Sequence, residues 1–447
     1  MPEVETMDQP DMTAHPGNAT LSAPGDRIGL SNEWHARPNI SLAAPLRCTH
    51  IIELHGKRTA EDTHGELGEL CALYAQSPPA AGSRYHILEA GSCLVKWENH
   101  TEATSHTVLV AGNGQPPFGE SALDFLDATQ RETLLENMFV GVQVEVLQDR
   151  DQLDPHGYEL AKSLLGAPVV YGGWMAGCTA VVWSSFRLDA RGFIRLVILD
   201  RGMEEEQLAR LLQRLLDMES YRMLAMKALP SAREVMTALQ ALEPQLDALM
   251  QRLAQYNDAA AREVALQQIT DIAARVEQLA SAHATQFGGA RAYAEIVERR
   301  AEEVREEILD NHQRYTNFLQ RALAPAMRTC EAAERRTQEV AQRVNRAANL
   351  LTTMVDMEQT RQSHGILESM VDRANTQLHL QQAVEGFSIF AISYYAVGMI
   401  KYVLEAAKGL GVSVDSTVVS GVSAPIVFAL VYFSVRAVRK KLLVGQS

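Results

Sequence analysis

The chain has 447 residues, of which 47% are hydrophobic, so it can hold two or three folded units and most of it is expected to be soluble. Its formal net charge is −14, which argues against nucleic acid as a partner. Five cysteines are scattered without a paired spacing, which excludes a disulfide framework or a zinc knuckle and fits a reducing cytosol: Cys48, Cys71, Cys93, Cys178 and Cys330.

Residues 1–30 are rich in Pro, Gly, Asp and Thr and show no apolar period, so we predict that they are disordered. The first twelve residues, MPEVETMDQPDM, have neither a basic region nor an apolar run. This argues against a cleaved signal peptide, and membrane insertion would have to rely on the C-terminal segments.

Residues 31–202 are predicted to form an α+β domain with a largely antiparallel sheet. Apolar residues at helical spacing indicate helices over 57–76, 123–137 and 158–165. Alternating residues indicate strands over 85–89, 93–98, 107–111, 140–147, 179–188 and 193–200. Gly91 and Gly192 supply the turns of two hairpins.

The run GGWMAG, Gly172 to Gly177, lacks the strand, helix and spacing of a dinucleotide-binding loop. We interpret it as a flexible strand edge or a bulge. No P-loop, metalloprotease, nucleophile-elbow or kinase motif occurs elsewhere, and we predict that the protein is not an enzyme.

Residues 203–386 are predicted to be a helical stalk with coiled-coil character. A first helix ends at Pro230, and Ser231 with Glu234 predicts the capping box of the next helix. That helix carries a heptad seam: Val235, Leu239, Leu242, Leu246, Leu249 and Leu253. Pro244 is expected to kink or interrupt it.

The seam resumes at Ile269, Ile272, Val276 and Leu279 and is predicted to end at Gly288-Gly289. A third helix is expected to close at Pro325. From Ala326 nothing forces a stop before about Lys408, so a continuous helix on the order of 120 Å long is predicted, which becomes the first membrane span. Whether the seam pairs within one chain or between chains stays open.

Residues 387–438 are predicted to be two transmembrane helices, 387–408 and 418–438. Val418 to Val435 carries no charge, and the first span requires that Lys401 extend its ammonium group to the interface. Arg436, Arg439, Lys440 and Lys441 follow the second span, so the basic tail, 439–447, should be cytoplasmic. A hairpin then also places the N-terminus in the cytoplasm, at a bacterial inner membrane.

Three polar residues, Glu98, His100 and Glu102, would share one face of a strand because side chains alternate. They could bind a divalent cation or perform acid-base chemistry, or they could form an exposed face with charge pairs. His35 and Arg37, just before Pro38, could serve a ligand or stabilise a loop.

Small and hydroxylated residues recur at steps of three and four in the first span: Ser388, Ala391, Tyr395, Gly398 and Tyr402. Such a stripe packs against a neighbouring helix or lines a water-filled path.

Several runs resemble a bacterial family of uncharacterised membrane-anchored proteins, the domain of unknown function 3422. They are NEWHARP, LVKWENHTEA, WSSFRLD with GFIRLVILDRG, MESYRMLAMKALP, FLQRALAPAMRTC and LHLQQAVEGFSIFAISYYAVGMIKY, in the family's order. The resemblance implies a cytoplasmic body on a membrane anchor and no established activity. Members usually have an aromatic residue after the HTE triplet, where this chain has Ala103-Thr104-Ser105.

The layout is also similar to that of CorA-type divalent-cation transporters, which are pentamers with an N-terminal α/β domain, a long helix and two C-terminal spans. Their first span ends in Gly-Met-Asn, whereas here Gly398-Met399 is followed by Ile400. Layout alone does not imply function.

The sequence therefore favours a membrane-anchored, non-enzymatic homo-oligomer whose cytoplasmic head senses or binds an unknown partner. The alternative is a CorA-like cation channel lined by Ser388, Tyr395 and Gly398, and the third reading is a membrane-tethered enzyme that uses His100 with Glu98 and Glu102. No cofactor is expected other than a divalent cation.

Overall fold

The computed structural model describes residues 40–56, 59–80, 82–149, 156–252, 259–409 and 415–444. The chain divides into two compact units, residues 1–254 with 267–346, and residues 255–266 with 347–447. We call them the sheet unit and the hairpin unit. The segment predicted to be disordered, 1–30, and the predicted ligand residues His35 and Arg37 lie outside the described residues.

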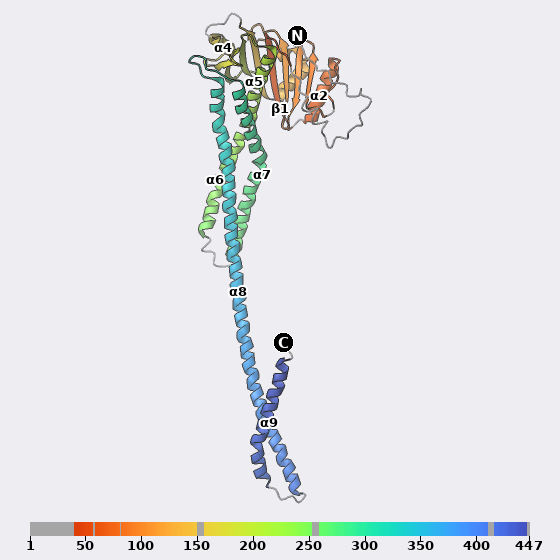
Figure 1. Ribbon diagram of the computed structural model, residues 1–447, viewed down its shortest axis with the longest axis vertical. Helices are drawn as coiled ribbons and strands as arrows, with labels where there is room; N and C mark the ends of the chain where they lie inside the picture. The colour runs from red at the N-terminus through yellow and green to blue at the C-terminus, as the bar shows by residue number, and fades with distance from the viewer. Residues whose placement is uncertain are drawn as a thin grey trace, which may run out of the picture. The chain divides into compact units, whose positions relative to one another are not determined.

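One mixed sheet forms the centre of the sheet unit (Figure 1). Its order is β2-β3-β4-β1-β5-β8-β7-β6, and all neighbours are antiparallel except the parallel pair β5 and β8. The strands are β1 (Leu46–Leu54), β2 (Tyr85–Ala90), β3 (Cys93–Asn99), β4 (Ala103–Ala111), β5 (Met138–Gln148), β6 (Tyr171–Met175), β7 (Ala180–Leu188) and β8 (Ile194–Asp200). The predicted sheet domain with helices is thus confirmed, with one parallel pair that the strand pattern did not indicate.

The region predicted as one helix over 123–137 is two short helices, η1 (Ala122–Phe125) and α3 (Ala128–Glu136). Ser121 and Asp127 each accept a hydrogen bond from a backbone N–H of the helix that follows. Each helix therefore has its own N-cap, and the second cap interrupts the continuous helix that the apolar spacing predicted.

One face of the sheet packs against α5 (Glu205–Met226), and apolar residues of β1, β5 and β8 form a common core with it. The opposite face carries two separate apolar clusters. One lies beneath α2 (Ala60–Leu73) and the other beneath α4 (Tyr158–Leu165). We call these the inner face, towards α5, and the outer face.

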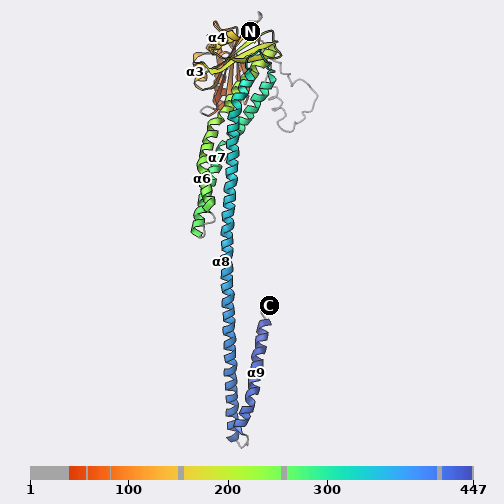
Figure 2. The same cartoon turned by 90° about the vertical axis from the view of Figure 1, so that its left-hand side faces the viewer.

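Three long helices follow α5: α6 (Ala228–Arg252), α7 (Ala259–Glu303) and α8 (Tyr315–Gly409). Within the sheet unit they lie side by side (Figures 1 and 2). The heptad residues are buried on all three, including Leu239 and Leu246 on α6, Ile269 and Val276 on α7, and Val340 on α8. The seam therefore pairs within one chain there.

The predicted helix boundary at Pro230 in α6 is wrong. The helix begins at Ala228, so Pro230 lies in its first turn, where a missing N–H costs nothing and Ser231 does not cap. Pro244 does not interrupt the helix, which is unbroken from Ala228 to Arg252. Its flanking seam residues Leu242 and Leu246 are buried, and their packing offsets the loss of one hydrogen bond.

The predicted breaks at Gly288-Gly289 and Pro325 are also wrong, because both lie inside helices. The break falls between α7 and α8 instead, where Arg305 and Asp310 have positive φ values of 49° and 44°. Glu306 then starts α8 by accepting hydrogen bonds from the backbone N–H groups of Tyr315 (2.6 Å) and Thr316 (2.8 Å).

In the hairpin unit, the later part of α8 contacts α9 (Ser416–Val444) through the rings of Phe390 and Phe428, whose centroids are 5.4 Å apart. Two of the described helices are long and apolar enough to cross a membrane, one within Tyr315–Ala406 and one over Val418–Ala437.

Candidate functional site

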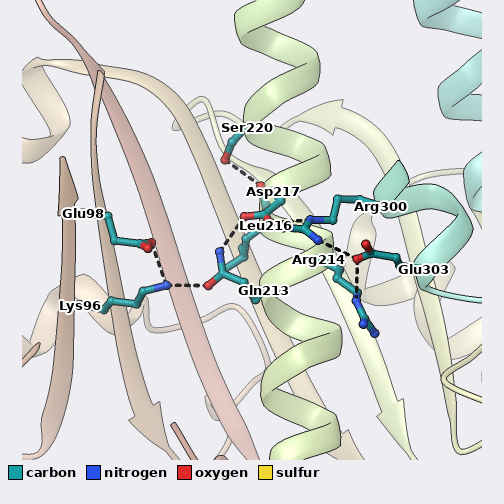
Figure 3. Close-up of polar contacts among 9 residues, drawn as sticks. All are labelled: Lys96, Glu98, Gln213, Arg214, Leu216, Asp217, Ser220, Arg300 and Glu303. Atoms are coloured by element: carbon teal, nitrogen blue, oxygen red, sulfur yellow. Dashed lines mark hydrogen bonds and ion pairs between the residues drawn. The ribbon is translucent and has the colours of Figure 1, made fainter. Parts of the chain in front are cut away.

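A chain of buried and half-buried polar contacts crosses the inner face of the sheet unit (Figure 3). It begins on β3, where Lys96 Nζ lies 2.7 Å from Glu98 Oε2 and donates a 2.6 Å hydrogen bond to Gln213 Oε1 of α5. Lys96 and Glu98 are only 8% and 7% exposed. The buried ion pair lies within β3 and is costly to separate, and the hydrogen bond from Lys96 to Gln213 is the contact that links β3 to α5.

The chain continues from α5 to α7 through Asp217. Gln213 Nε2 donates to Asp217 Oδ1 at 2.6 Å, and Arg300 Nε donates to Asp217 Oδ2 at 2.8 Å. Burial raises the pKa of the Asp217 carboxyl, while the hydrogen bond from Gln213 and the charge of Arg300 oppose that rise. The carboxylate therefore links the helix on the sheet to the helix of the bundle.

Glu303 closes the network on α7. It accepts hydrogen bonds from Arg300 Nη1 at 2.7 Å and from Arg214 Nε of α5 at 3.1 Å. Partial burial alone would raise the pKa of Glu303, but the bonds and charges of the two arginines outweigh it and lower that pKa. We call the set Glu98, Lys96, Gln213, Asp217, Arg300, Glu303 and Arg214 the charge network.

A histidine lies on the same face of the sheet. His50 Nδ1 is 2.8 Å from Thr107 Oγ1 and its Nε2 is 3.0 Å from Ser220 Oγ. Burial, together with the nearby Lys96, lowers the pKa of His50 to about 3, so the imidazole is neutral. Since Ser220 Oγ donates its proton to the Leu216 carbonyl at 2.7 Å, the hydroxyl accepts from His50, and the pair is not poised for nucleophilic attack.

The first residue of α8 is tied to α5 by a second buried carboxylate. Glu219 accepts 2.6 Å hydrogen bonds from Tyr315 Oη and from Arg222 Nε. Glu219 and Tyr315 have no exposed surface. Burial and the charge of Glu219 raise the pKa of Tyr315, so the phenol keeps its proton and donates it.

The segment before α8 is attached to the edge of the sheet. Glu307 and Trp174 of β6 exchange two backbone hydrogen bonds, 2.8 and 3.2 Å long. A Cβ atom on Gly173 would lie 2.7 Å from the Glu307 carbonyl oxygen. The GGWMAG run is thus an edge strand, as predicted, and Gly173 is needed for the close approach of this segment.

The structure does not place Glu98, His100 and Glu102 on one strand face, because β3 ends at Asn99. Glu98 pairs with Lys96, whereas His100 packs edge-on against Tyr221 at 6.5 Å between ring centroids. Among the described residues no three His, Cys, Asp or Glu side chains are arranged to hold a metal ion.

Most of the predicted stripe in α8 is exposed. Ser388, Ala391, Tyr395 and Tyr402 are exposed and Gly398 is half-buried, whereas Ser393 is buried. The proposed interface residues Lys401 and Arg436 are exposed. Arg439, Lys440 and Lys441 belong to α9, which extends to Val444.

Sequence reasoning missed most of the charge network. A lysine at a strand position, as at Lys96, and a Gln-Asp pair four residues apart on the amphipathic helix α5 were the available signals. Neither signal reveals Arg300, which is 83 residues from its partner Asp217.

Comparison with known proteins gives a family and no activity. A family model described as "Protein of unknown function (DUF3422)" matches residues 23–442. No curated protein matches the sequence. Since the match covers more than half of the chain, the protein belongs to the DUF3422 family.

Proposed function

We propose that this protein is a membrane-anchored, non-enzymatic oligomer whose sheet unit binds a cytoplasmic partner or ligand. The observation that carries the proposal is α8. This one helix, Tyr315–Gly409, contains both Tyr315, which is buried in the core of the sheet unit, and the apolar segment after Phe387. A folded unit and a membrane-length segment on one continuous helix are typical of an anchored protein.

The orientation in this proposal follows from charge. Arg436, Arg439, Lys440 and Lys441 follow the second apolar segment, and an excess of basic residues marks the cytoplasmic side of a membrane. The sheet unit would then be cytoplasmic, at a bacterial inner membrane. Its free cysteines, four of them buried, fit a reducing compartment.

Self-association is supported by the exposed part of α8. From residue 356 to residue 384 no side chain of the helix is buried, yet large apolar side chains recur there: Met357, Ile366, Leu367, Met370, Val371, Leu378, Leu380 and Val384. An isolated helix in water gains little from propensity alone, and apolar side chains are normally covered. Copies of the same helix, aligned side by side, would cover them.

The charge network supports a coupling role for the sheet unit. It joins β3 to α5 through the hydrogen bond from Lys96 to Gln213, and α5 to α7 through the half-buried pair of Asp217 and Arg300. Glu219 joins α5 to the start of α8. Because buried charges tolerate few arrangements, a change at the sheet is expected to shift the helices rather than to be absorbed locally.

Fractionation of cells that express the full chain tests the anchor. We expect the protein to remain with the membrane after washing at alkaline pH, and a variant with Leu430→Arg and Val431→Arg in the second span to be released. Full-length protein recovered in the soluble fraction would contradict the proposal. A C-terminal reporter that is active only in the periplasm would overturn the orientation.

The mass of the purified complex in detergent tests the oligomer and separates the anchor from a channel. We expect more than one copy, and a monomer would contradict self-association. A closed ring of at least three copies would favour a cation pathway, and that pathway predicts that Gly398→Trp blocks ion flux in liposomes. Ion flux that is unchanged in the Gly398→Trp variant would contradict the channel and leave the membrane-anchored binding protein as the proposed function.

A further inference from the structure

The centre of the outer face carries buried polar side chains that lack hydrogen-bond partners. Gln143 of β5 is 3% exposed, and neither its Nε2 nor its Oε1 has a partner in the part of the chain that the structure describes. Glu145 Oε2 and Arg195 Nε are also buried atoms without a partner among the described residues, and the Arg195 side chain as a whole is 25% exposed. Buried polar atoms in native proteins are almost always hydrogen-bonded, so these atoms indicate a group that binds there.

The three side chains are neighbours. Gln143 is the register partner of Arg195 on β8, and Glu145 is two residues along the same strand and therefore on the same face. The two positions on β5 are about 6.6 Å apart along the strand. Apolar clusters flank this position on both sides, under α2 and under α4.

The segment 112–121 covers the position. Glu120 pairs with Arg47 at 3.0 Å, Ser121 Oγ lies 3.1 Å from Thr49 Oγ1, and the Phe118 N–H donates to Glu145 Oε1 at 2.8 Å. A group bound between this segment and the sheet would be shielded from solvent, where hydrogen bonds discriminate well between ligands.

The charged groups at this position favour an uncharged ligand, because they already have partners of opposite charge. Both guanidinium groups at the position already have acidic partners, since Arg47 pairs with Glu120 and Arg195 with Asp189 at 2.8 Å. The groups that need partners are an amide, one guanidinium N–H and one carboxyl oxygen. An amide presents a donor beside an acceptor and is matched by a planar group with the complementary pair.

We propose that Gln143, Glu145 and Arg195 bind a small, neutral, planar molecule with a carbonyl acceptor beside an N–H donor, as in an amide, a ureide or a nucleobase edge. Gln143 Nε2 and Arg195 Nε donate to the ligand carbonyl, and the ligand N–H donates to Gln143 Oε1 or Glu145 Oε2. The assignment does not depend on membrane anchoring, because all of these residues belong to the sheet unit.

Calorimetry on the full-length protein in detergent tests the site, with uracil as the probe. We expect uracil to bind, and N,N′-dimethylated uracil, which keeps the ring and carbonyls but lacks N–H donors, to bind at least about tenfold more weakly. Gln143→Met should weaken uracil binding by at least about tenfold, whereas Gln148→Met, at the exposed end of the same strand, should not.

The melting temperature of each variant is measured alongside. Gln143→Met removes a buried amide in favour of an apolar side chain of similar size and is expected to stay folded. If it does not fold, Arg195→Lys keeps the charge beside Asp189, displaces the N–H donor and is expected to weaken binding. No binding of uracil to the wild type, or equal binding to the wild type and these variants, would overturn the proposal.

Discussion

Tyr315 Oη donates a 2.6 Å hydrogen bond to Glu219 Oε1, and neither side chain has any exposed surface. This contact joins the first residue of α8 to the helix that covers the sheet. Tyr315→Phe keeps the ring and removes the donor, so one oxygen of a buried carboxylate loses its partner. We expect a loss of about 1–3 kcal/mol in the free energy of unfolding of the sheet unit, measured by chemical denaturation.

Tyr158→Phe is the matched control for this change. The Tyr158 hydroxyl has no hydrogen bond among the described residues, so its removal should change the stability by less than about 0.5 kcal/mol. Equal losses for the two variants would show that the Tyr315 hydroxyl does not hold the helices together.

The pair of Lys96 and Glu98 predicts strong coupling in a double-mutant cycle. Lys96→Met leaves a buried carboxylate without its cation and should cost about 3–5 kcal/mol of unfolding free energy. Glu98→Gln made in that background should restore part of the stability, because no charge is then left unpaired. Lys227→Met, at an exposed position, serves as the control. Additive effects of the two changes would refute the coupling.

His50 predicts a specific loss of stability in acid. Its pKa is about 3 in the folded protein against an ordinary value of 6.5, because the buried ring cannot take up a proton. Between these values the unfolded chain binds a proton that the folded chain does not. The contribution of His50 to stability is therefore fully present above pH 6.5 and falls by about 1.4 kcal/mol per pH unit towards pH 3.

The measurement is the unfolding free energy between pH 7 and pH 4 for the wild type and His50→Gln. The variant keeps a hydrogen-bonding side chain without the titration, so its dependence on pH should be shallower by about 1.4 kcal/mol per unit. His379→Gln, at an exposed position of α8, should retain the wild-type slope. Parallel curves for His50→Gln and the wild type would show that His50 does not titrate as stated.

Gly173 predicts a local effect on the segment before α8. Gly173→Ala places a Cβ atom 2.7 Å from the Glu307 carbonyl oxygen, so the backbone pair between β6 and Glu307 must open. We expect faster amide hydrogen exchange in residues 304–314 by mass spectrometry. Gly65→Ala, where the added atom meets nothing within 4 Å, should leave that exchange unchanged. Unaltered exchange in the Gly173 variant would contradict the close approach.

Local chemistry in the sequence predicted several elements well. Period-two alternation located six of the eight described strands and missed β1, and turn residues such as Gly91 and Gly192, both with positive φ, located the hairpins. Boundaries were less predictable. Pro230, Pro244 and Pro325 all lie within helices. Pro230 is tolerated because it lies in the first turn of α6, whereas apolar packing around Pro244 and Pro325 outweighs the propensity of one residue.

The candidate sites were predicted less well than the fold. Glu98, His100 and Glu102 alternate in the sequence, but β3 ends at Asn99, and the actual partner of Glu98 is Lys96. The side chains of Asp217 and Arg300 meet only because α5 and α7 pack against each other, and no spacing in the sequence records that contact. The predicted stripe of Ser388 and Tyr395 is present on α8 and is exposed.

The sequence by itself determined the features that depend on neighbouring residues: the strand and helix periods, the acidic composition, the two apolar C-terminal helices and the family. Only the tertiary structure decided which buried charges are paired and which polar atoms, such as those of Gln143, lack a partner. The reason is physical. Periodicity and hydropathy are local properties of the chain, whereas the energy of a buried polar group depends on side chains brought to it from distant segments.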